Sequence, residues 1–245
     1  MVDIFFSEFQ KLKRKKILVT LLLVMNILPI LLAVYFKMLP PNSPVVGNFP
    51  SFYKMCLAYM GLLILPIIIG ILIAYFFHLE YSNNILKQLL VIPIKKRDIV
   101  ISKFLVIEVL SIILMLIYAL VVIIGGVLIG KFEIPLLSIG RVVLLALGTG
   151  VLIPIACSPI LIFTSISRSI ILPVCVSFVY ALIGFMGAES LVSVHTVLNA
   201  INIIYYKNTE GLLISGNVIV SIVNLSIITV ISITLSILFF KRREE

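Results

Sequence analysis

The sequence predicts an all-α integral membrane protein that crosses the bilayer six times. Of its 245 residues, 62% are hydrophobic and only 12% are charged, and the mean hydropathy is +1.30. A soluble domain of this length needs more charge to cover its surface, so the excess of apolar side chains faces lipid. The apolar runs are continuous rather than alternating, which favours helices over the strands of a barrel.

Six apolar runs are long enough to be spans. About 20 residues in a helix cross the ~30 Å hydrocarbon core. The fifth run is the shortest and the weakest of the six. The predicted spans are residues 17–36, 57–77, 104–129, 142–165, 170–187 and 218–240.

The basic residues predict which side of the membrane each connection occupies. If the six spans alternate in direction, most of the 19 Lys and Arg residues fall on the side of the two termini. Cytoplasmic loops carry such an excess, so both termini are expected in the cytoplasm. The residues on that side are Lys11, Lys13, Arg14, Lys15, Lys16, Lys87, Lys95, Lys96, Arg97, Lys103, Arg168, Lys241, Arg242 and Arg243.

Two cytoplasmic segments are expected to form helices that do not cross the membrane. Residues 2–12 place their apolar side chains on one helical face, which predicts a short amphipathic helix in the membrane plane; the alternative is a frayed terminus. In residues 82–99, Ser82 is a suitable N-cap and Pro93 ends the helix. The apolar residues of this second helix, at helical spacing, are Ile85, Leu86, Leu89 and Leu90.

The sequence offers little chemistry of its own. Its three cysteines are scattered, which argues against a disulfide framework or a metal site. Gly125 to Lys131 matches the start of a phosphate-binding loop but lies at the end of a span, so we treat the match as accidental. We therefore expect no catalytic residue, no metal and no bound cofactor on this chain, and we read its basic charge as membrane anchoring rather than nucleic-acid binding.

Glu108 is the one carboxylate that falls clearly within an apolar run. An ionisable residue at membrane depth is costly and is a candidate functional group. The alternative is a structural pairing with Lys103 or another basic side chain near the cytoplasmic end of the span.

The stretch from Glu80 to Lys103, together with the six-span pattern, resembles the ABC-2 type permeases, the membrane subunits of a class of ABC exporters. It reads Glu80-Tyr-Ser-Asn-Asn-Ile-Leu-Lys-Gln-Leu-Leu90, followed by Pro93 and Arg97. The resemblance covers the whole chain, 1–245, as one transmembrane domain. It implies that residues 82–99 are a coupling segment that docks on a separate ATPase, with contacts from Glu80, Ile85, Leu86, Leu89, Leu90 and Arg97.

The resemblance is greatest to the small permeases of bacterial lantibiotic immunity transporters. It implies a subunit of the bacterial cytoplasmic membrane that exports an antimicrobial peptide and confers immunity or resistance. It also implies a second permease, either identical or a sister subunit, and an ABC ATPase that binds ATP and Mg²⁺. Two alternatives stay open: an ABC permease for another drug, lipid or peptide, and a secondary transporter or membrane immunity factor unrelated to ABC proteins.

Overall fold

The computed structural model describes residues 9, 16–40, 48–82, 96–131, 133–167, 169–187, 191, 194–206 and 216–242. All regular elements among these residues are helices, which agrees with the predicted class. In chain order they are α2 (Ile17–Met38), α3 (Phe49–Tyr59), the π-helix η1 (Met60–Ile64), α4 (Leu65–Ser82), α6 (Lys96–Ile129), α7 (Leu136–Ala156), α8 (Pro159–Ile166), α9 (Ile171–Met186), α10 (Thr196–Ile204) and α11 (Val218–Arg242).

Within these described residues, five helical stretches are long and apolar enough to cross a membrane. They are Ile17–Met38, Phe49–Leu79, Arg97–Ile129, Leu136–Ala156 and Val218–Phe240, and each corresponds to a predicted span. The remaining prediction, 170–187, corresponds to α9, an apolar helix of 16 residues. At 1.5 Å per residue α9 is about 24 Å long, shorter than the hydrocarbon core, so its crossing stays a prediction.

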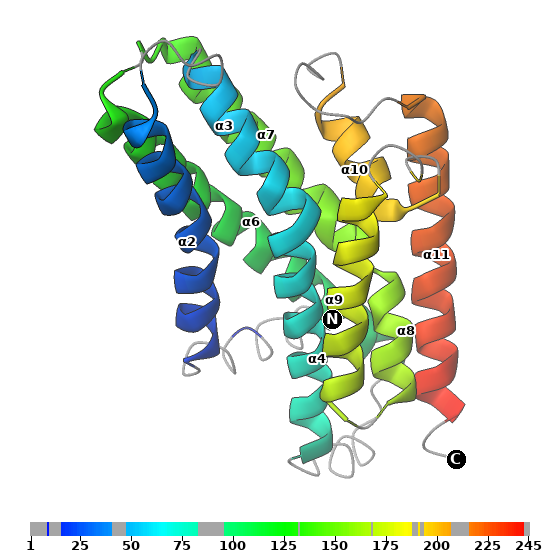
Figure 1. The fold of residues 1–245 in the computed structure, drawn as a ribbon. Helices are drawn as coiled ribbons and strands as arrows, with labels where there is room; N and C mark the ends of the chain where they lie inside the picture. Colours follow the sequence, from blue (N-terminus) through cyan, green and yellow to red (C-terminus); the bar gives the residue numbers. More distant parts are fainter. Residues whose placement is uncertain are drawn as a thin grey trace.

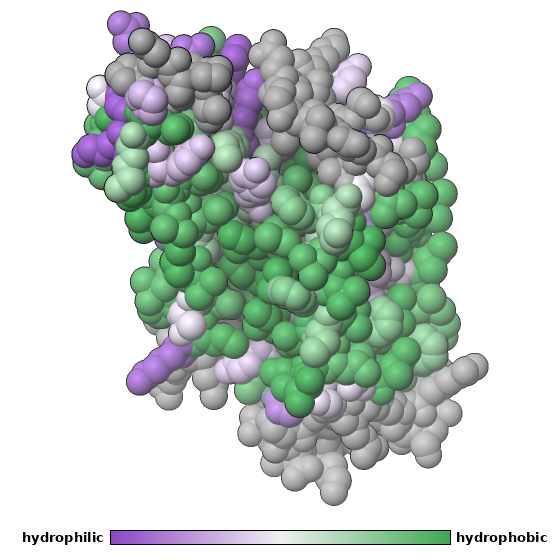
Figure 2. All heavy atoms as spheres, viewed as in Figure 1, coloured by the Kyte–Doolittle hydropathy of each residue, from purple (hydrophilic) through white to green (hydrophobic). Residues whose placement is uncertain are grey.

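The helices form an upright bundle with α2 at one edge and α11 at the opposite edge (Figure 1). The last turn of α4, the connection between α8 and α9, and the last turn of α11 lie together at one end of the bundle. We call this end the base. Hydrophobic residues cover the middle of the visible face and hydrophilic ones lie toward its two ends (Figure 2). This banding is the surface that a bilayer requires.

The second predicted span is longer than expected. Its helix begins at Phe49 rather than at residue 57, with Pro50 in the first turn, where its missing N–H costs nothing. The helix then widens into η1 just before Pro66. A wide turn next to a proline relieves the clash of its ring with the preceding turn, so the helix continues through α4 to Ser82.

The third predicted span also begins earlier than expected, at Lys96 instead of residue 104. Asp98 in its first turn complements the helix dipole, and Ile99 and Val100 are buried in the bundle. The helix therefore extends past the apolar run from which the boundary was predicted. Ser82 is the last residue of α4, and residues 96–99 of the predicted coupling segment 82–99 belong to the start of α6. Residues 83–95, between the two helices, lie outside the described residues, so the predicted coupling helix stays a prediction.

The fourth predicted span, 142–165, is two helices, α7 and α8, separated at Cys157 and Ser158. Pro159 opens α8 and has no N–H to donate to the carbonyl of Ile155. The amides of Ser158 and Ile160 instead make short-range bonds, to the carbonyls of Ile155 (3.1 Å) and Cys157 (3.0 Å). The break therefore lies within the span that was predicted as one continuous helix.

Helix α10 was not predicted from the sequence. It lies between α7, α11 and η1, and all its residues from Thr196 to Asn202 are buried. Ile201 approaches Gly61 of η1 so closely that a Cβ there would lie 2.7 Å from its Cδ1. The connection before α11 therefore contributes to the core.

Close packing between α4 and α9 depends on one glycine. A Cβ at Gly70 would lie 2.0 Å from Cβ of Ser177, whereas a Cβ at Gly140 of α7 would meet nothing within 4 Å. Small residues at such contacts let membrane helices approach each other without a hydrophobic driving force.

We predict that Gly70→Leu destabilises the protein and that Gly140→Leu does not. Overpacking of this kind costs about 1–3 kcal/mol, because α4 and α9 must move apart. The apparent melting temperature of the detergent-solubilised protein measures both changes. Equal melting temperatures for the two variants would contradict the packing of α9 on α4.

Candidate functional site

The residues predicted to couple with an ATPase are placed only in part. Glu80 lies in the last helical turns of α4, and Arg97 is exposed in the first turn of α6. Ile85, Leu86, Leu89 and Leu90 lie outside the described residues. The structure therefore describes the two helices that bracket the segment rather than the segment itself.

The ends of α4 and α6 are joined by a lysine. Lys103 is fully buried, and its Nζ donates a hydrogen bond of 2.8 Å to the carbonyl of Phe76. It also lies 5.9 Å and 5.4 Å from the ring centroids of Phe76 and Phe77. The two helices that bracket residues 83–95 are therefore held together close to that segment.

Glu108 is partly buried in α6, and neither of its carboxylate oxygens has a hydrogen-bond partner in the described part of the chain. The structural pairing with Lys103 that the sequence allowed is not made. Ser111, one turn further along α6, is buried and likewise without a partner for its hydroxyl. Glu108 thus keeps its standing as a candidate intramembrane functional group.

The break between α7 and α8 carries a hydrogen-bond network. The amide of Ile160 bonds Cys157, so the carbonyl of Ala156 receives no helical amide there and accepts a bond from the hydroxyl of Thr196 in α10. The hydroxyl of Thr229 in α11 donates at 2.7 Å to Leu225 of its own helix and also reaches within 3.4 Å of the Ile155 carbonyl. Two later helices therefore supply donors to the break.

The network continues into α9 through Tyr180. The single hydroxyl proton of Thr196 goes to Ala156, so the Tyr180 hydroxyl is the donor in its bond to Thr196 Oγ1. His195 Nε2 donates to the carbonyl of Tyr180 at 3.1 Å, and the two rings lie 4.3 Å apart. Burial lowers the pKa of His195, which favours the neutral ring, and this bond opposes the effect.

Polar side chains recur along α10 at a spacing of three residues. Thr196 contacts the break, and Asn202 Nδ2 donates at 2.9 Å to the hydroxyl of Ser221 in α11. Between them Asn199 is fully buried, and neither its amide nitrogen nor its oxygen has a partner among the residues that the structure describes. Buried amides without partners are rare in folded proteins, which marks this stripe as a functional candidate.

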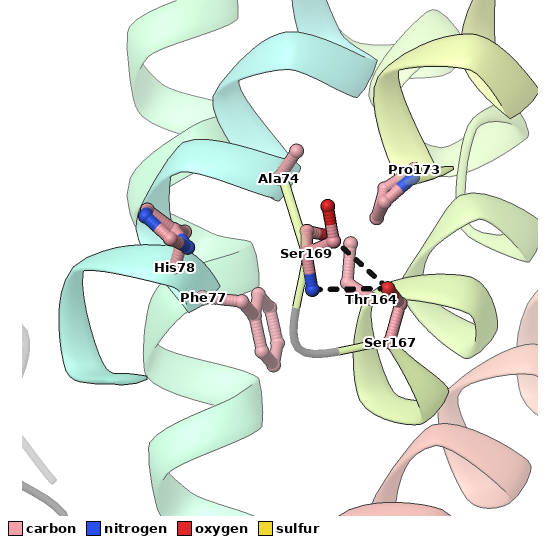
Figure 3. A pocket seen from close by; sticks show the side chains of 7 residues that line it. All are labelled: Ala74, Phe77, His78, Thr164, Ser167, Ser169 and Pro173. Carbon is pink, nitrogen blue, oxygen red and sulfur yellow. Dashed lines mark hydrogen bonds between the residues drawn. The ribbon is translucent and has the colours of Figure 1, made fainter. Parts of the chain in front are cut away.

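A small pocket at the base lies between α4 and the connection from α8 to α9 (Figure 3). Its hydroxyls are already used locally. Ser167 exchanges hydrogen bonds with the backbone of Ser169, and Thr164 donates to the carbonyl of Leu161 at 2.7 Å. The hydrogen bonds of Ser167 therefore stabilise the turn before α9, and the hydroxyls of Ser167 and Thr164 already have partners within the chain. It is lined by Ala74, Phe77, His78, Thr164, Ser167, Ser169 and Pro173.

Two features of the described residues concern metal binding and phosphate binding. Among the described residues, no three His, Cys, Asp or Glu side chains gather where they could hold a metal ion. Of the two glycines in the phosphate-loop match, Gly125 lies within α6 and Gly130 follows directly after the end of that helix, so the match does not form a loop between a strand and a helix. Neither observation identifies a reaction for this chain.

A family model described as an ABC-2 family transporter protein matches residues 4–184. The chain belongs to the ABC-2 transporter family. The matched region runs from before α2 into α9 and includes residues 83–95. No curated protein matches the chain significantly.

Family membership confirms the coarse part of the resemblance. This ABC-2 protein is a multi-pass membrane permease, and its family implies a partner ABC ATPase. The apolar band and the five helices of spanning length agree with that assignment.

We predict that Thr196→Val lowers the free energy of unfolding by about 1–2 kcal/mol, because it leaves the Ala156 carbonyl and the Tyr180 hydroxyl without their bonds. Thr234→Val is the matched control, since Thr234 donates only within α11, to the carbonyls of Val230 and Ile231. Unfolding in mixed micelles with increasing SDS measures both. An equal loss in the two variants would contradict the role of the break.

Proposed function

We propose that this chain is the permease subunit of an ATP-driven exporter that expels an antimicrobial peptide of the lantibiotic class. The family match over residues 4–184 carries the proposal of an ABC permease. The lantibiotic cargo follows from the resemblance to small immunity permeases, which the sequence supplied. In this proposal ATP and Mg²⁺ bind to a separate ATPase, and the chain itself catalyses no reaction.

A second permease completes the transporter. Six predicted spans are half of the twelve that such exporters use, so the partner is another copy of this chain or a sister subunit. Each permease presents one coupling segment to one half of the ATPase. The described bundle contributes α4 and α6, the two helices that this segment connects.

The base of the bundle faces the cytoplasm in this proposal. The ends of α4 and α11 and the connection from α8 to α9 lie together there. In the sequence, Lys87 and Lys95 lie between α4 and α6, Arg168 lies between α8 and α9, and Arg243 follows α11, while Arg97 lies in the first turn of α6. An excess of basic residues at one end is typical of the cytoplasmic side, which supports cytoplasmic termini.

ATP drives export by changing the relative stability of two arrangements of the spans. Closure of the ATPase around ATP moves the coupling segments, and the bundles tilt so that access changes from the inner side to the outside. A ligand shifts such an equilibrium only by its differential affinity for the two states. The peptide must therefore bind the inward-facing arrangement more tightly than the outward-facing one.

We predict that Leu86→Asp or Leu89→Asp abolishes resistance to the exported lantibiotic without removing the chain from the membrane. A buried carboxylate on the apolar face of the coupling helix opposes docking on the ATPase. Growth in a lantibiotic dilution series, with the complete transporter expressed, measures the loss. Immunoblotting of membrane fractions measures insertion.

Leu136→Asp is the control for this experiment. Leu136 is 84% exposed at the start of α7, at the opposite end of the bundle, so the same change there leaves docking intact. Full resistance in correctly inserted Leu86→Asp and Leu89→Asp cells would contradict the coupling role. Absence of protection by the unaltered transporter against the whole lantibiotic panel would contradict the cargo.

A further inference from the structure

Lys103 occupies an unusual position for a lysine in a membrane helix. Its side chain has no exposed surface, although it lies near the polar start of α6. Lysines at the ends of membrane helices usually extend to the interface and keep their ammonium group in water. Here the ammonium group turns into the bundle and donates to a backbone carbonyl of another helix, that of Phe76 in α4.

The same contact extends to a third helix. Phe77 lies beside the ammonium group, with its ring centroid 5.4 Å from Nζ, and packs edge-to-face on Phe240 near the end of α11 at 6.1 Å. Ser165 of α8 bonds Ser236, one turn before Phe240, at 2.6 Å. The bases of α4, α6, α8 and α11 are thus tied together around Lys103.

Desolvation makes this connection stiff. Removing an ammonium group from water is expensive, and the hydrogen bond to Phe76 and the two aromatic faces offset part of that cost while they stay in place. Sliding α6 along α4 would break the contacts of the buried ammonium group with Phe76 and Phe77. Relative motion of the two helices at this level is therefore opposed more strongly than it would be between apolar side chains, which exchange neighbours at little cost.

We propose that Lys103 is a positioning residue that makes the base of α4, α6 and α11 one mechanical unit. In the sequence, residues 83–95 connect α4 to α6, two of the helices in this unit. A displacement of that segment then moves the three helices together, and it reaches α11 and the outer end of the bundle. This inference rests on the proposed function, because it takes the ATPase as the source of the displacement.

Lys131 offers a matched control at the other end of α6. Its Nζ also donates to backbone carbonyls of a neighbouring helix end, those of Lys37 and Leu39, each at 2.7 Å. It is exposed, and it ties α2 rather than α4 to α6. Lys131→Met therefore removes the same kind of contact without touching the base.

The test is the response of the outer end to the ATPase cycle. The complete transporter carries Val194→Cys as a reporter in a Cys175→Ser background, because Val194 is 68% exposed just before α10 and Cys175 is an exposed native thiol. It is reconstituted in phosphatidylethanolamine–phosphatidylglycerol vesicles. The labelling rate with a membrane-impermeant maleimide is compared before and after trapping with ATP and vanadate, alongside the amount of bound ATPase.

Trapping is expected to change the labelling rate about fivefold or more in the otherwise unaltered transporter, the usual range for coupled sites. Lys103→Met should keep its ATPase and its basal hydrolysis but lose this change, while Lys131→Met keeps it. Phe240→Leu, which removes only the ring contact to α11, should reduce the change. A conserved response in Lys103→Met, or equal loss in Lys131→Met, overturns the proposal.

Three further outcomes are distinguishable from these. If Lys103→Met no longer binds the ATPase, Lys103 is a folding residue and the positioning role is wrong. If Phe240→Leu responds fully, the contact between Phe77 and Phe240 does not join α11 to the unit, and the proposal is wrong in that form. If the unaltered transporter binds no ATPase, the proposed function fails, and the failure appears before any change at Lys103 is made.

Discussion

The architecture depends on satisfying the backbone at the break between α7 and α8, within the predicted fourth span. A proline that interrupts a helix frees carbonyl groups, and lipid offers them no donor. Here Pro159 causes the break, and the hydroxyl of Thr196 bonds the Ala156 carbonyl. That single bond fixes the start of α10 within the bundle, and Tyr180 connects it to α9. The start of α10 therefore meets a backbone requirement of the break, in addition to burying its apolar side chains in the core.

The two ends of the bundle are held by different chemistry. At the base, a buried lysine and aromatic rings join α4, α6 and α11. At the opposite end, Lys131 caps the carbonyls that end α2, and Phe49 packs where a Cβ at Gly126 would lie 2.3 Å away. Elsewhere in the bundle, Asn199 and Glu108 keep polar atoms without partners in the described region.

The all-helical class, five of the six predicted spans and the family could be predicted from the sequence, because continuous apolar runs and the Glu80–Lys103 stretch are local signals. The sequence misplaced the starts of α3 and α6, since hydropathy marks the lipid-facing run rather than the helix, and Lys96 and Phe49 lie beyond that run. It missed α10, whose Thr196, Asn199 and Asn202 reduce its hydropathy and whose burial comes from tertiary packing. The hydrogen bond from Lys103 to the carbonyl of Phe76 could not be predicted either, because every residue has a backbone carbonyl and the residue type does not show which one accepts a bond.

In the proposed function, this permease is one subunit of a transporter whose ATP-hydrolysing subunit is another polypeptide. Purification of the tagged chain from its native membranes in mild detergent, with quantification of the bound proteins, tests that claim most directly. The account predicts recovery of an ABC ATPase in fixed stoichiometry, together with a second permease or a second copy of this chain. Recovery of the intact, folded chain with no ATPase, under conditions that preserve other ABC complexes from the same membranes, would contradict it.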